Sequence, residues 1–360
     1  MNILHICYLD NDKASGVSVI VPQYALSQVK NNNVYILNVS NIISEPIEGV
    51  EIFTRKRSLE EIISKNNIEI AVFHGIYFKE YIKYYKILKK NNIPYVVVPH
   101  VSLHENAQKQ KRIPKIILNR LFYNSFIYNS SMIQYLSESE KKASAKFSHK
   151  SCIIPNGIFI SDKYIWKPIE KEYFDFIFIG RYAIFHKGLD ILVEACEEIQ
   201  YFMRKNKIRV NLYGVDFEGD LKKLNEMIYK KKLADIILIH DGVYGNEKYQ
   251  KMVGADCFIQ TSRMEGQPVG IIEALSVGLV SIVTEGTTFA EFVEKEKCGY
   301  NAGTTTHSVA ETMKKVYNEK EKLQEKSISA RKSIKNNFSW NIVSKKMQKM
   351  YREVIDQYIK

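Results

Sequence analysis

The chain has 360 residues and an ordinary globular composition, with 45% hydrophobic and 26% charged residues. These values exclude a disordered chain, a collagen-like chain and a disulfide-rich miniprotein, and the length is typical of two domains. Lysine and arginine outnumber aspartate and glutamate by 52 to 40, which gives a formal net charge of +12. This basic balance favours an anionic partner: a phosphorylated substrate, a nucleic acid or an acidic membrane surface.

Five cysteines are dispersed along the sequence, mostly in apolar runs, and none forms a CxxC pair. This pattern predicts buried thiols in a reducing compartment. The first residues lack the pattern of a signal peptide, and no apolar run approaches the roughly 20 residues of a membrane span. We therefore expect a cytoplasmic protein, soluble or peripheral to a membrane. The cysteines are Cys7, Cys152, Cys196, Cys257 and Cys298.

The first half of the chain alternates short apolar runs with longer helical patterns. Such alternation predicts a parallel sheet with right-handed helical crossovers. Helices are predicted at residues 17–30, which a glycine precedes, and at the Lys- and Tyr-rich residues 77–91. The predicted strands are residues 2–9, 34–39, 69–74, 94–100, 131–136 and 152–155.

Residues 161–173 show no clear period, and the strand and helix pattern then starts again. The sequence therefore predicts a fold of the α/β class, with two doubly wound Rossmann-like domains at residues 1–165 and 166–340. Residues 308–360 are helical and carry no strand signal. In the second half the predicted strands are 174–179, 209–214, 236–240, 256–261 and 280–284, and the predicted helices are 189–205, 221–233 and 244–253.

Ligands of doubly wound sheets bind outside the carboxyl ends of the strands, so we expect the two domains to face a central cleft there. The strongest local signal, Ser262 to Glu273, follows the strand predicted at 256–261. Pro268 suits the first helical position, Glu265 falls in the loop before it, and Gly266 supplies a flexible turn. A helix N-terminus binds a diphosphate, and a carboxylate accepts hydrogen bonds from a ribose or sugar diol. The plainer alternative is a pair of solvated glutamates favoured by the helix dipole.

A second signal follows the strand at 174–179, where Gly180 and Arg181 precede Lys187 and Gly188. Two cations between a strand end and a helix start are typical of a phosphate clamp, although surface cations are common in this chain.

Two weaker signals lie in the first half of the sequence. His100 ends the strand at 94–100 and could bond a substrate hydroxyl, as could His74 with lower weight; a structural histidine is the alternative. Gly16 follows the first strand and would let the backbone approach a ligand, although a single glycine is a weak signal.

Together these segments resemble the retaining glycosyltransferases of family 4, the group 1 family with the GT-B fold, over nearly the whole chain. Glu265 and Glu273 match the family's paired-glutamate motif. The other matches are Gly180-Arg181 and Lys187-Gly188 for the phosphate clamp, Pro99-His100 for the first domain, Ile154-Pro155-Asn156-Gly157 for the hinge-side loop, and Phe338-Ser339-Trp340 for the entry to the final helix. The resemblance implies that this helix, at about residues 341–360, packs back on the first domain.

The resemblance also implies a role for each matched residue. Arg181 and Lys187 would hold the donor diphosphate as leaving group, Glu273 the ribose, Glu265 the transferred sugar and His100 a sugar hydroxyl. The implied catalytic residues are Glu265, His100, Arg181 and Lys187. The implied donor-binding residues are Gly16, Arg181, Lys187, Glu265, Gly266, Val269, Gly270 and Glu273. The first domain would lie on the acceptor side and the second would bind the sugar nucleotide.

Three positions depart from the family pattern. Ser15, Val101 and Pro268 stand where many members have glycine, so the backbone contacts expected at Pro268 would fall to Val269 and Gly270. No DxD-like acid pair follows a strand, so we expect no metal and no other cofactor. A front-face reaction with the leaving phosphate as base would need no protein nucleophile.

The resulting hypothesis is a retaining, metal-independent glycosyltransferase that uses a nucleotide-sugar donor and a glycan or polyprenyl-diphosphate-linked acceptor. Its setting would be bacterial cell-surface polysaccharide synthesis, of O-antigen or capsule. The alternatives are a non-catalytic GT-B scaffold subunit and another sugar-nucleotide enzyme such as an epimerase.

The positive charge is concentrated between residues 79 and 120, which hold ten Lys or Arg and two Glu. Aromatic and aliphatic residues lie in the same region, and this combination is typical of helices that bind anionic membrane surfaces. The membrane surface expected here is the inner face of the plasma membrane. A lysine-rich solvated face above a core stripe is the alternative. No nucleic-acid motif accompanies the charge, so we expect no nucleic-acid partner.

Overall fold

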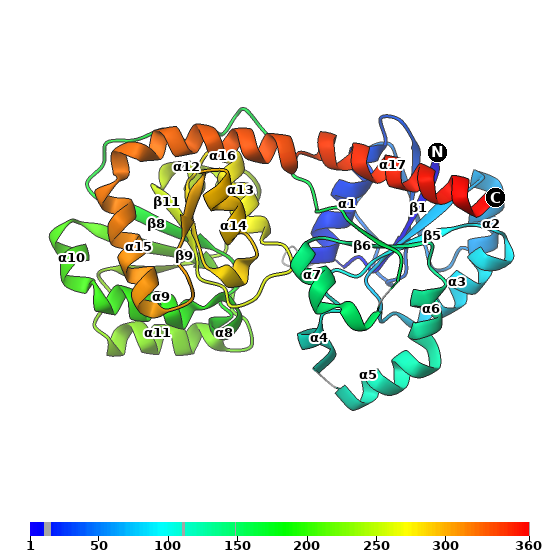
Figure 1. The fold of residues 1–360 in the computed structure, drawn as a ribbon, viewed down its shortest axis with the longest axis horizontal. Coiled ribbons are helices and arrows are strands. Elements are labelled where there is room, and N and C mark those ends of the chain that lie inside the picture. The colour runs from blue at the N-terminus through cyan, green and yellow to red at the C-terminus, as the bar shows by residue number, and fades with distance from the viewer. Residues whose placement is uncertain (11–15, 110–111, 148, 360) are drawn as a thin grey trace. The chain divides into compact units, whose positions relative to one another are not determined.

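The structure is a computed structural model that describes residues 1–10, 16–109, 112–147 and 149–359. It divides into two compact units. Unit 1 comprises Met1–Gly157 with Trp340–Lys360, and unit 2 comprises Ile158–Ser339. Each unit has one parallel sheet with helices on both faces (Figure 1), so the prediction of two doubly wound α/β sheets is confirmed.

The sheet of unit 1 has seven strands in the order β3-β2-β1-β4-β5-β6-β7, and every adjacent pair is parallel. The order reverses between β1 and β4, which is the switch point where ligands of such sheets bind. The strands are β1 Asn2–Cys7, β2 Asn33–Asn38, β3 Val50–Thr54, β4 Ile70–His74, β5 Tyr95–Val98, β6 Met132–Tyr135 and β7 Ser151–Ile153.

Helices cover both faces of this sheet because its strands are apolar on both sides. The face that carries Ile3 and Ile36 packs against α1 and α17, and the face that carries Leu4 and Leu37 packs against α2, α3 and α6. The helices are α1 Gly16–Gln28, α2 Leu59–Asn66, α3 Lys79–Lys90, α4 Glu105–Lys109, α5 Arg112–Leu118, the π-helix η1 Asn119–Tyr123, α6 Asn124–Tyr128, α7 Glu138–Ala143, the 3₁₀ helix η2 Ala145–Phe147 and α17 Trp340–Ile359.

The sheet of unit 2 has six parallel strands in the order β10-β9-β8-β11-β12-β13, with its reversal between β8 and β11. The strands are β8 Phe174–Ile179, β9 Ile208–Gly214, β10 Ile237–Asp241, β11 Cys257–Gln260, β12 Ser281–Val283 and β13 Gly299–Asn301. The helices are α8 Ile184–Lys187, α9 Leu189–Glu198, α10 Gln200–Lys205, α11 Asp220–Lys230, α12 Gly245–Gly254, α13 Val269–Val277, η3 Glu285–Thr287, α14 Ala290–Lys295, α15 Thr306–Asn318, η4 Lys320–Lys322 and α16 Leu323–Asn337.

The lysine-rich helix α3 lies in the region for which membrane binding was hypothesised, residues 79–120. Tyr81, Tyr84 and Tyr85 are buried in the core of unit 1, and the lysines of α3 are exposed. The helix is amphipathic because one stripe packs on the sheet and the other faces solvent. In α3 these tyrosines are therefore core residues, and the lysines form the exposed face.

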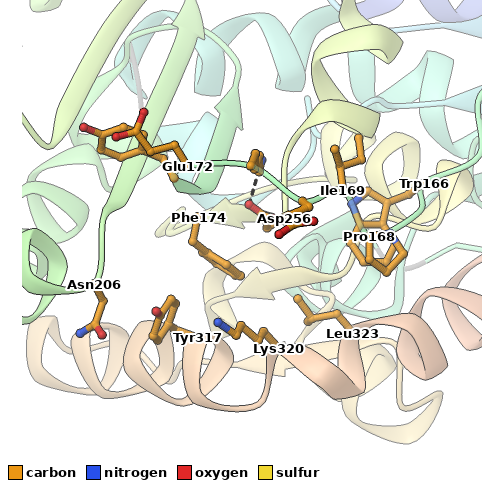
Figure 2. A pocket seen from close by; sticks show the side chains of 13 residues that line it. Trp166, Pro168, Ile169, Glu172, Phe174, Asn206, Asp256, Tyr317, Lys320 and Leu323 are labelled. Carbon is orange, nitrogen blue, oxygen red and sulfur yellow. Dashed lines mark ion pairs between the residues drawn. The ribbon is translucent and has the colours of Figure 1, made fainter.

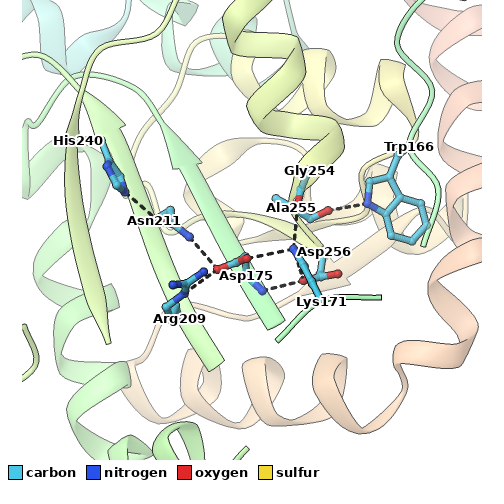
Figure 3. Close-up of polar contacts among 9 residues, drawn as sticks. All are labelled: Trp166, Lys171, Asp175, Arg209, Asn211, His240, Gly254, Ala255 and Asp256. Atoms are coloured by element: carbon cyan, nitrogen blue, oxygen red, sulfur yellow. Dashed lines mark hydrogen bonds and ion pairs between the residues drawn. The ribbon is translucent and has the colours of Figure 1, made fainter. Parts of the chain in front are cut away.

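The segment of residues 161–173 has neither helix nor strand, but polar contacts hold it to the rest of unit 2 (Figure 3). Trp166 Nε1 donates to the Ala255 carbonyl at 2.6 Å. Lys171 Nζ lies 3.1 Å from Asp175 Oδ2 and 2.8 Å from Asp256 Oδ2, so one ammonium pairs with two largely buried carboxylates. Arg209 Nε also donates to Asp175, at 3.0 Å.

The chain passes between the units twice, at Gly157–Ile158 and at Ser339–Trp340. On the unit 2 side of these two crossings, the backbones are hydrogen-bonded to each other: Ile158 N donates to the Phe338 carbonyl at 2.8 Å. In unit 1 Gly157 faces the Trp340 indole, and a Cβ at Gly157 would lie 2.5 Å from this ring. Glycine is therefore required at this end of the predicted hinge-side loop.

Candidate active site

The site predicted in unit 2 is formed by two loops at the switch point of its sheet. Residues 180–188 follow β8, and residues 261–268 follow β11, its neighbour in the sheet. Both loops begin at carboxyl ends of parallel strands, so they meet at one edge of the sheet. Their backbones are joined: Arg263 N donates to the His186 carbonyl at 3.0 Å, and Thr261 Oγ1 donates to the Gly188 carbonyl at 2.8 Å.

Gly188 explains how the first loop turns so tightly against the second. Its φ is +61°, in the left-handed region, and a Cβ at this position would lie 2.0 Å from the Thr261 carbonyl oxygen. A side chain would therefore separate the two loops. The turn places Lys187 beside the second loop.

Lys187 and Glu265 form an ion pair between the two loops. Lys187 Nζ lies 2.6 Å from Glu265 Oε1, and both side chains are largely buried. The same oxygen accepts from Gln260 Nε2 and from Ser262 Oγ, each at 2.7 Å. Three donors thus fix the carboxylate, which leaves it little freedom of orientation.

Glu273 is the second acid of the predicted pair, and it lies on α13. Lys248 of α12 pairs with its carboxylate, and both side chains are largely buried. Lys248 also lies over the ring of Tyr249, 5.5 Å from its centroid. Each predicted glutamate therefore has its own lysine partner, which does not fit the alternative of two solvated helix-start acids.

Arg181 is exposed just after β8, and its guanidinium stacks over the Phe217 ring at 4.7 Å. Among the described residues, no carboxylate pairs with this guanidinium. The stacked arginine therefore has donors available for an anion.

The start of α13 differs from the prediction. Pro268 is the N-cap and α13 begins at Val269, so Pro268 is not the first helical residue. Its carbonyl accepts from the N–H groups of Ile271 and Ile272, which is a capping role that proline can fill. Val269 N already donates to the Gln267 carbonyl at 3.0 Å.

The two glycines predicted to bind the donor in this loop lie on either side of Pro268. Gly266 is half-buried and precedes the cap. Gly270 lies in the first turn of α13, where a Cβ would make ordinary contacts with Phe258, Ile179 and Gln260. Both glycines therefore lie at the edge of the sheet where β8 and β11 end.

The remaining predicted residues belong to unit 1. His100 follows β5 and is half-buried, and burial lowers its pKa to about 4. Its Nε2 lies 3.0 Å from Nδ1 of His74, the last residue of β4. Gly16 is the exposed first residue of α1, and a Cβ there would meet no atom within 4 Å. Ser15, one of the departures from the family pattern, lies outside the described residues.

Three polar residues that hold the paired glutamates were not predicted from the sequence. Gln260 and Ser262 bond Glu265, and Lys248 bonds Glu273. Gln260 has a recognisable signal, because it is a polar residue at the end of an otherwise apolar strand. Lys248 has none, since it is one of many lysines and meets Glu273 only through the packing of α12 on α13.

A separate pocket of unit 2 lies at the amino ends of the strands (Figure 2). Phe174 begins β8 and Asp256 directly precedes β11, so this pocket is at the opposite edge of the sheet from Lys187 and Glu265. The Asp256 carboxylate is already paired with Lys171. Ligands of doubly wound sheets bind at the carboxyl ends, so we do not assign this pocket to the site. Its other lining residues include Trp166, Pro168, Ile169, Tyr317, Lys320 and Leu323.

One group in the described part of the chain has the ligand spacing of a metal site. Glu198, His307 and Glu311 are exposed on α9 and α15, and His307 Nδ1 lies 2.6 Å from Glu198 Oε1. None of these residues belongs to the predicted site.

Within the described ranges, the helices are too short or too polar to cross a membrane.

Residues 162–333, which form most of unit 2, match the family model described as glycosyl transferases group 1. The chain is 28% identical over 188 residues to the glycogen synthase of Thermodesulfovibrio yellowstonii, a match that covers 50% of this chain and 35% of the synthase. The chain thus spans about a third of the length of that relative.

Two solved structures share the fold of nearly the whole chain. Sucrose-phosphate synthase of Thermosynechococcus elongatus superposes with a TM-score of 0.80 at 12% identity, covering 99% of this chain and 100% of that one. HepE of Anabaena, solved in complex with UDP and glucose, gives a TM-score of 0.74 at 16% identity and covers 98% and 100%. Both units therefore have the GT-B fold of these structures, and residues 162–333 match the group 1 glycosyl transferases.

Proposed function

We propose that the protein transfers a sugar from a nucleotide-sugar donor to an acceptor, with retention of anomeric configuration and without a metal ion. The observation that carries this proposal is the convergence of Lys187 and Glu265 at the switch point of unit 2. This edge lies within the region that matches the family model. The UDP and glucose bound by HepE fit the same class of donor.

In the proposed reaction, the cations stabilise the departing diphosphate. The Lys187 ammonium has three N–H donors, of which one is directed to Glu265, so the others can bond phosphate oxygens. Arg181 adds a planar guanidinium without a carboxylate partner among the described residues. Charge that grows on the diphosphate as the glycosidic bond breaks is stabilised by these fixed cations. A donor of this kind typically lowers the barrier by about 2.7–4 kcal/mol.

The two glutamates are proposed to position the donor. Glu273, held by Lys248, would accept hydrogen bonds from the ribose diol, and Glu265 would bond the transferred sugar. His100 of unit 1 would bond a sugar hydroxyl, and Gly16 would lie near the phosphates. The leaving phosphate would deprotonate the acceptor on the same face of the sugar, so no residue acts as nucleophile.

The acceptor is proposed to be lipid-linked, as in cell-surface polysaccharide synthesis of the O-antigen or capsule type. The support is an apolar patch, defined as the exposed side chains of Ile116, Ile117, Leu118, Leu121 and Phe122. These residues lie on α5 and on η1, which directly follows it; Figure 1 shows α5 at the periphery of unit 1. An exposed group of this kind suits docking to the inner face of an anionic membrane.

The proposed membrane contact is this apolar patch, which is only part of the region expected from the sequence, residues 79–120. Lys115 donates to the Ala107 carbonyl and lies over the Tyr77 ring, and Lys109 pairs with Glu105 at 3.7 Å. Lys111, expected beside them, lies outside the described residues. Apolar insertion is therefore proposed to contribute more than lysine charge.

The central test is a transfer assay of Lys187→Ala over a panel of UDP-, GDP- and dTDP-sugars. We expect kcat with the best donor to fall about 100- to 1,000-fold, because one fixed cation is lost. Lys231→Ala is the control, since Lys231 forms a comparable lysine–glutamate pair with Glu197 away from the site loops. Unchanged transfer by Lys187→Ala would contradict the proposal.

The same assay separates the alternatives. A scaffold subunit would bind no donor and transfer nothing, and an epimerase would convert the nucleotide sugar without an acceptor. We expect transfer to persist in EDTA; activity lost in EDTA and restored by Mn²⁺ would contradict the metal-independent reaction.

A further inference from the structure

Three histidines that are far apart in the sequence form a hydrogen-bonded chain across the switch point of unit 1. His5 lies in β1, His74 ends β4 and His100 follows β5, and these strands are neighbours in the sheet. His5 Nδ1 lies 2.9 Å from His74 Nε2, and His74 Nδ1 lies 3.0 Å from His100 Nε2. The ring planes differ by 34° and 24°, so each in-plane N–H can point at the in-plane lone pair of the next ring.

The surroundings of the three hydrogen-bonded histidines keep their rings uncharged. His5 and His74 are fully buried, and Tyr24 packs edge-on against His74 with ring centroids 5.1 Å apart. Burial lowers the pKa of all three histidines. A neutral imidazole has one N–H and one bare nitrogen, so all protons along the chain must point the same way.

Gln28, the last residue of α1, determines that direction. Its Oε1 lies 3.2 Å from His5 Nε2. Its Nε2 lies 3.8 Å from the Met347 sulfur of α17, and a thioether can only accept a hydrogen bond. The amide nitrogen is therefore assigned to the side of Met347, and the oxygen faces His5 as an acceptor.

We infer that Gln28, His5 and His74 are positioning residues that hold His100 in the tautomer with a proton on Nε2 and a bare Nδ1. His5 Nε2–H donates to Gln28, His74 Nε2–H donates to His5, and His100 Nε2–H donates to His74. Nδ1 of His100, the nitrogen outside the chain, can then accept a hydrogen bond but cannot donate one.

The backbone at His100 is also fixed. Its φ is 47° and that of Val101 is 69°, both in the left-handed region. The N–H of Val101 donates to Oε1 of the buried Glu140 at 2.7 Å, and the other carboxylate oxygen accepts from Leu136 N at 2.7 Å. The ring is thus held through the histidine chain and the backbone through Glu140.

This tautomer has a consequence for recognition that rests on the proposed function, because it takes His100 as a contact of the transferred sugar. A hydroxyl can donate to the bare Nδ1, whereas a phosphate or carboxylate oxygen has no proton to give. His100 would therefore select a sugar hydroxyl and disfavour an anion at this position. Replacing the contacted hydroxyl by fluorine should remove the hydrogen bond in wild-type protein.

Nitrogen-15 NMR of histidine-labelled, ligand-free protein at neutral pH tests the chain directly. We expect the Nε2–H tautomer for all three residues, with scalar couplings across the His100–His74 and His74–His5 hydrogen bonds. Assignment uses single histidine substitutions, and His149→Gln is the control because His149 bonds the Ser130 carbonyl outside the chain. A proton on Nδ1 of His100, or a charged ring, would overturn the inference.

Two variants of similar size test the role of Gln28. Gln28→Leu removes the acceptor, so His100 should become a mixture of tautomers and kcat/KM should fall about tenfold. Gln28→Glu keeps an acceptor facing His5, so it should retain the single tautomer and most of the activity. If Gln28→Glu fails to fold, the tautomer of wild type and of Gln28→Leu still decides. A single unchanged tautomer in Gln28→Leu would overturn the role of Gln28.

The NMR measurement needs no substrate, which separates this inference from the proposed function. Failure to find the chain removes the inference and leaves the proposed transfer standing. Conversely, an intact chain in a protein that transfers no sugar supports the inference and contradicts the proposed function.

Discussion

At the scale of single residues, Val101 has an unusual backbone for a β-branched side chain. Its φ of 69° costs roughly 1–2 kcal/mol for a residue with a Cβ, and glycine avoids this cost. The strain lies next to His100, and the buried Glu140 offsets it by accepting the Val101 N–H. This geometry accounts for the glycine that the family pattern has at the position.

We predict that Val101→Gly is more stable than Val101→Ala by about 1 kcal/mol. Both variants remove the same side-chain contacts, so their difference reports the backbone alone. At an ordinary helical position the sign is opposite, with glycine about 1 kcal/mol less stable than alanine. Urea unfolding of the two variants measures the difference, and a more stable alanine variant would show that the backbone is not strained.

The three linked histidines predict that unit 1 loses stability in acid. Burial lowers the pKa of His5 and His100 to about 4, whereas each titrates near 6.5 in the unfolded chain. Between these values the unfolded state binds protons that the folded state does not, so lowering the pH favours unfolding. The expected loss of unfolding free energy is about 1.4 kcal/mol per pH unit for each histidine within this range. Above about pH 6.5 the two histidines add no pH dependence to the stability.

The two tryptophans separate the response of each unit, since Trp340 lies in unit 1 and Trp166 in unit 2. Urea unfolding of Trp166→Phe, followed by Trp340 fluorescence, should show the steep loss below pH 6.5. The Trp340→Phe protein reports unit 2 as the comparison. Equal unfolding free energies of unit 1 at about pH 7 and pH 5 would contradict the prediction.

The sequence supports residue-level prediction only where the signal is local. Arg181, Lys187, Glu265 and Glu273 each follow an apolar strand within a short motif, which made them recognisable. The histidine chain is different, because His5 looks like one residue of an apolar strand and Gln28 like a polar residue late in a helix. Their roles follow from strands and helices that meet only in the folded unit.

At the scale of elements, strands with continuous apolar runs were predicted, and strands without them were missed. β8 Phe174–Ile179 has the predicted bounds. β3 was missed because only Phe53 of this edge strand is buried and the strand includes Glu51, and β13 because it is Gly-Tyr-Asn, with a single apolar residue. The helix predicted at 189–205 is two helices that meet at Ile199. The α2 helix, which follows the missed strand β3, was not predicted either.

The prediction for membrane docking concerns two exposed apolar residues of the π-helix η1. Leu121 and Phe122 are 64% and 46% exposed, and burial of a fully exposed side chain of this kind is worth roughly 1.5–3 kcal/mol, of which each can still gain the exposed part. Changing both to serine should therefore lower the affinity for anionic vesicles by at least tenfold in co-sedimentation, while donor binding persists. The double variant Tyr201→Ser and Tyr229→Ser is the control, since both tyrosines are exposed in unit 2. Wild-type protein that ignores anionic vesicles at low salt would contradict the prediction.

At the scale of the whole molecule, the two units differ in continuity. Unit 2 is a single segment, Ile158–Ser339, whereas unit 1 needs α17 from beyond it. Met347, Tyr351 and Val354 of α17 are buried in the same core as Ile3 and Tyr24. Losing three such side chains would remove several kcal/mol, comparable with the whole stability of a domain.

We therefore predict that residues 158–339 fold cooperatively when expressed alone, whereas residues 1–157 do not. Joining residues 340–360 to the amino terminus of residues 1–157 through a flexible linker should restore folding of unit 1. Urea unfolding with circular dichroism measures each protein. A cooperative transition of residues 1–157 without α17 would show that this helix is dispensable.

The return of α17 to unit 1 also sets an order of events during synthesis. About 180 residues of unit 2 are translated between Gly157 and Trp340, which takes roughly 10–40 s at elongation rates of about 5–20 residues per second. During that interval the sheet face that carries Ile3 and Ile36 lacks one of its covering helices, while unit 2 has every residue it needs as soon as it emerges. The unit that begins at the amino terminus is therefore the last to be completed, and on the ribosome it is the one with an apolar face available to chaperones.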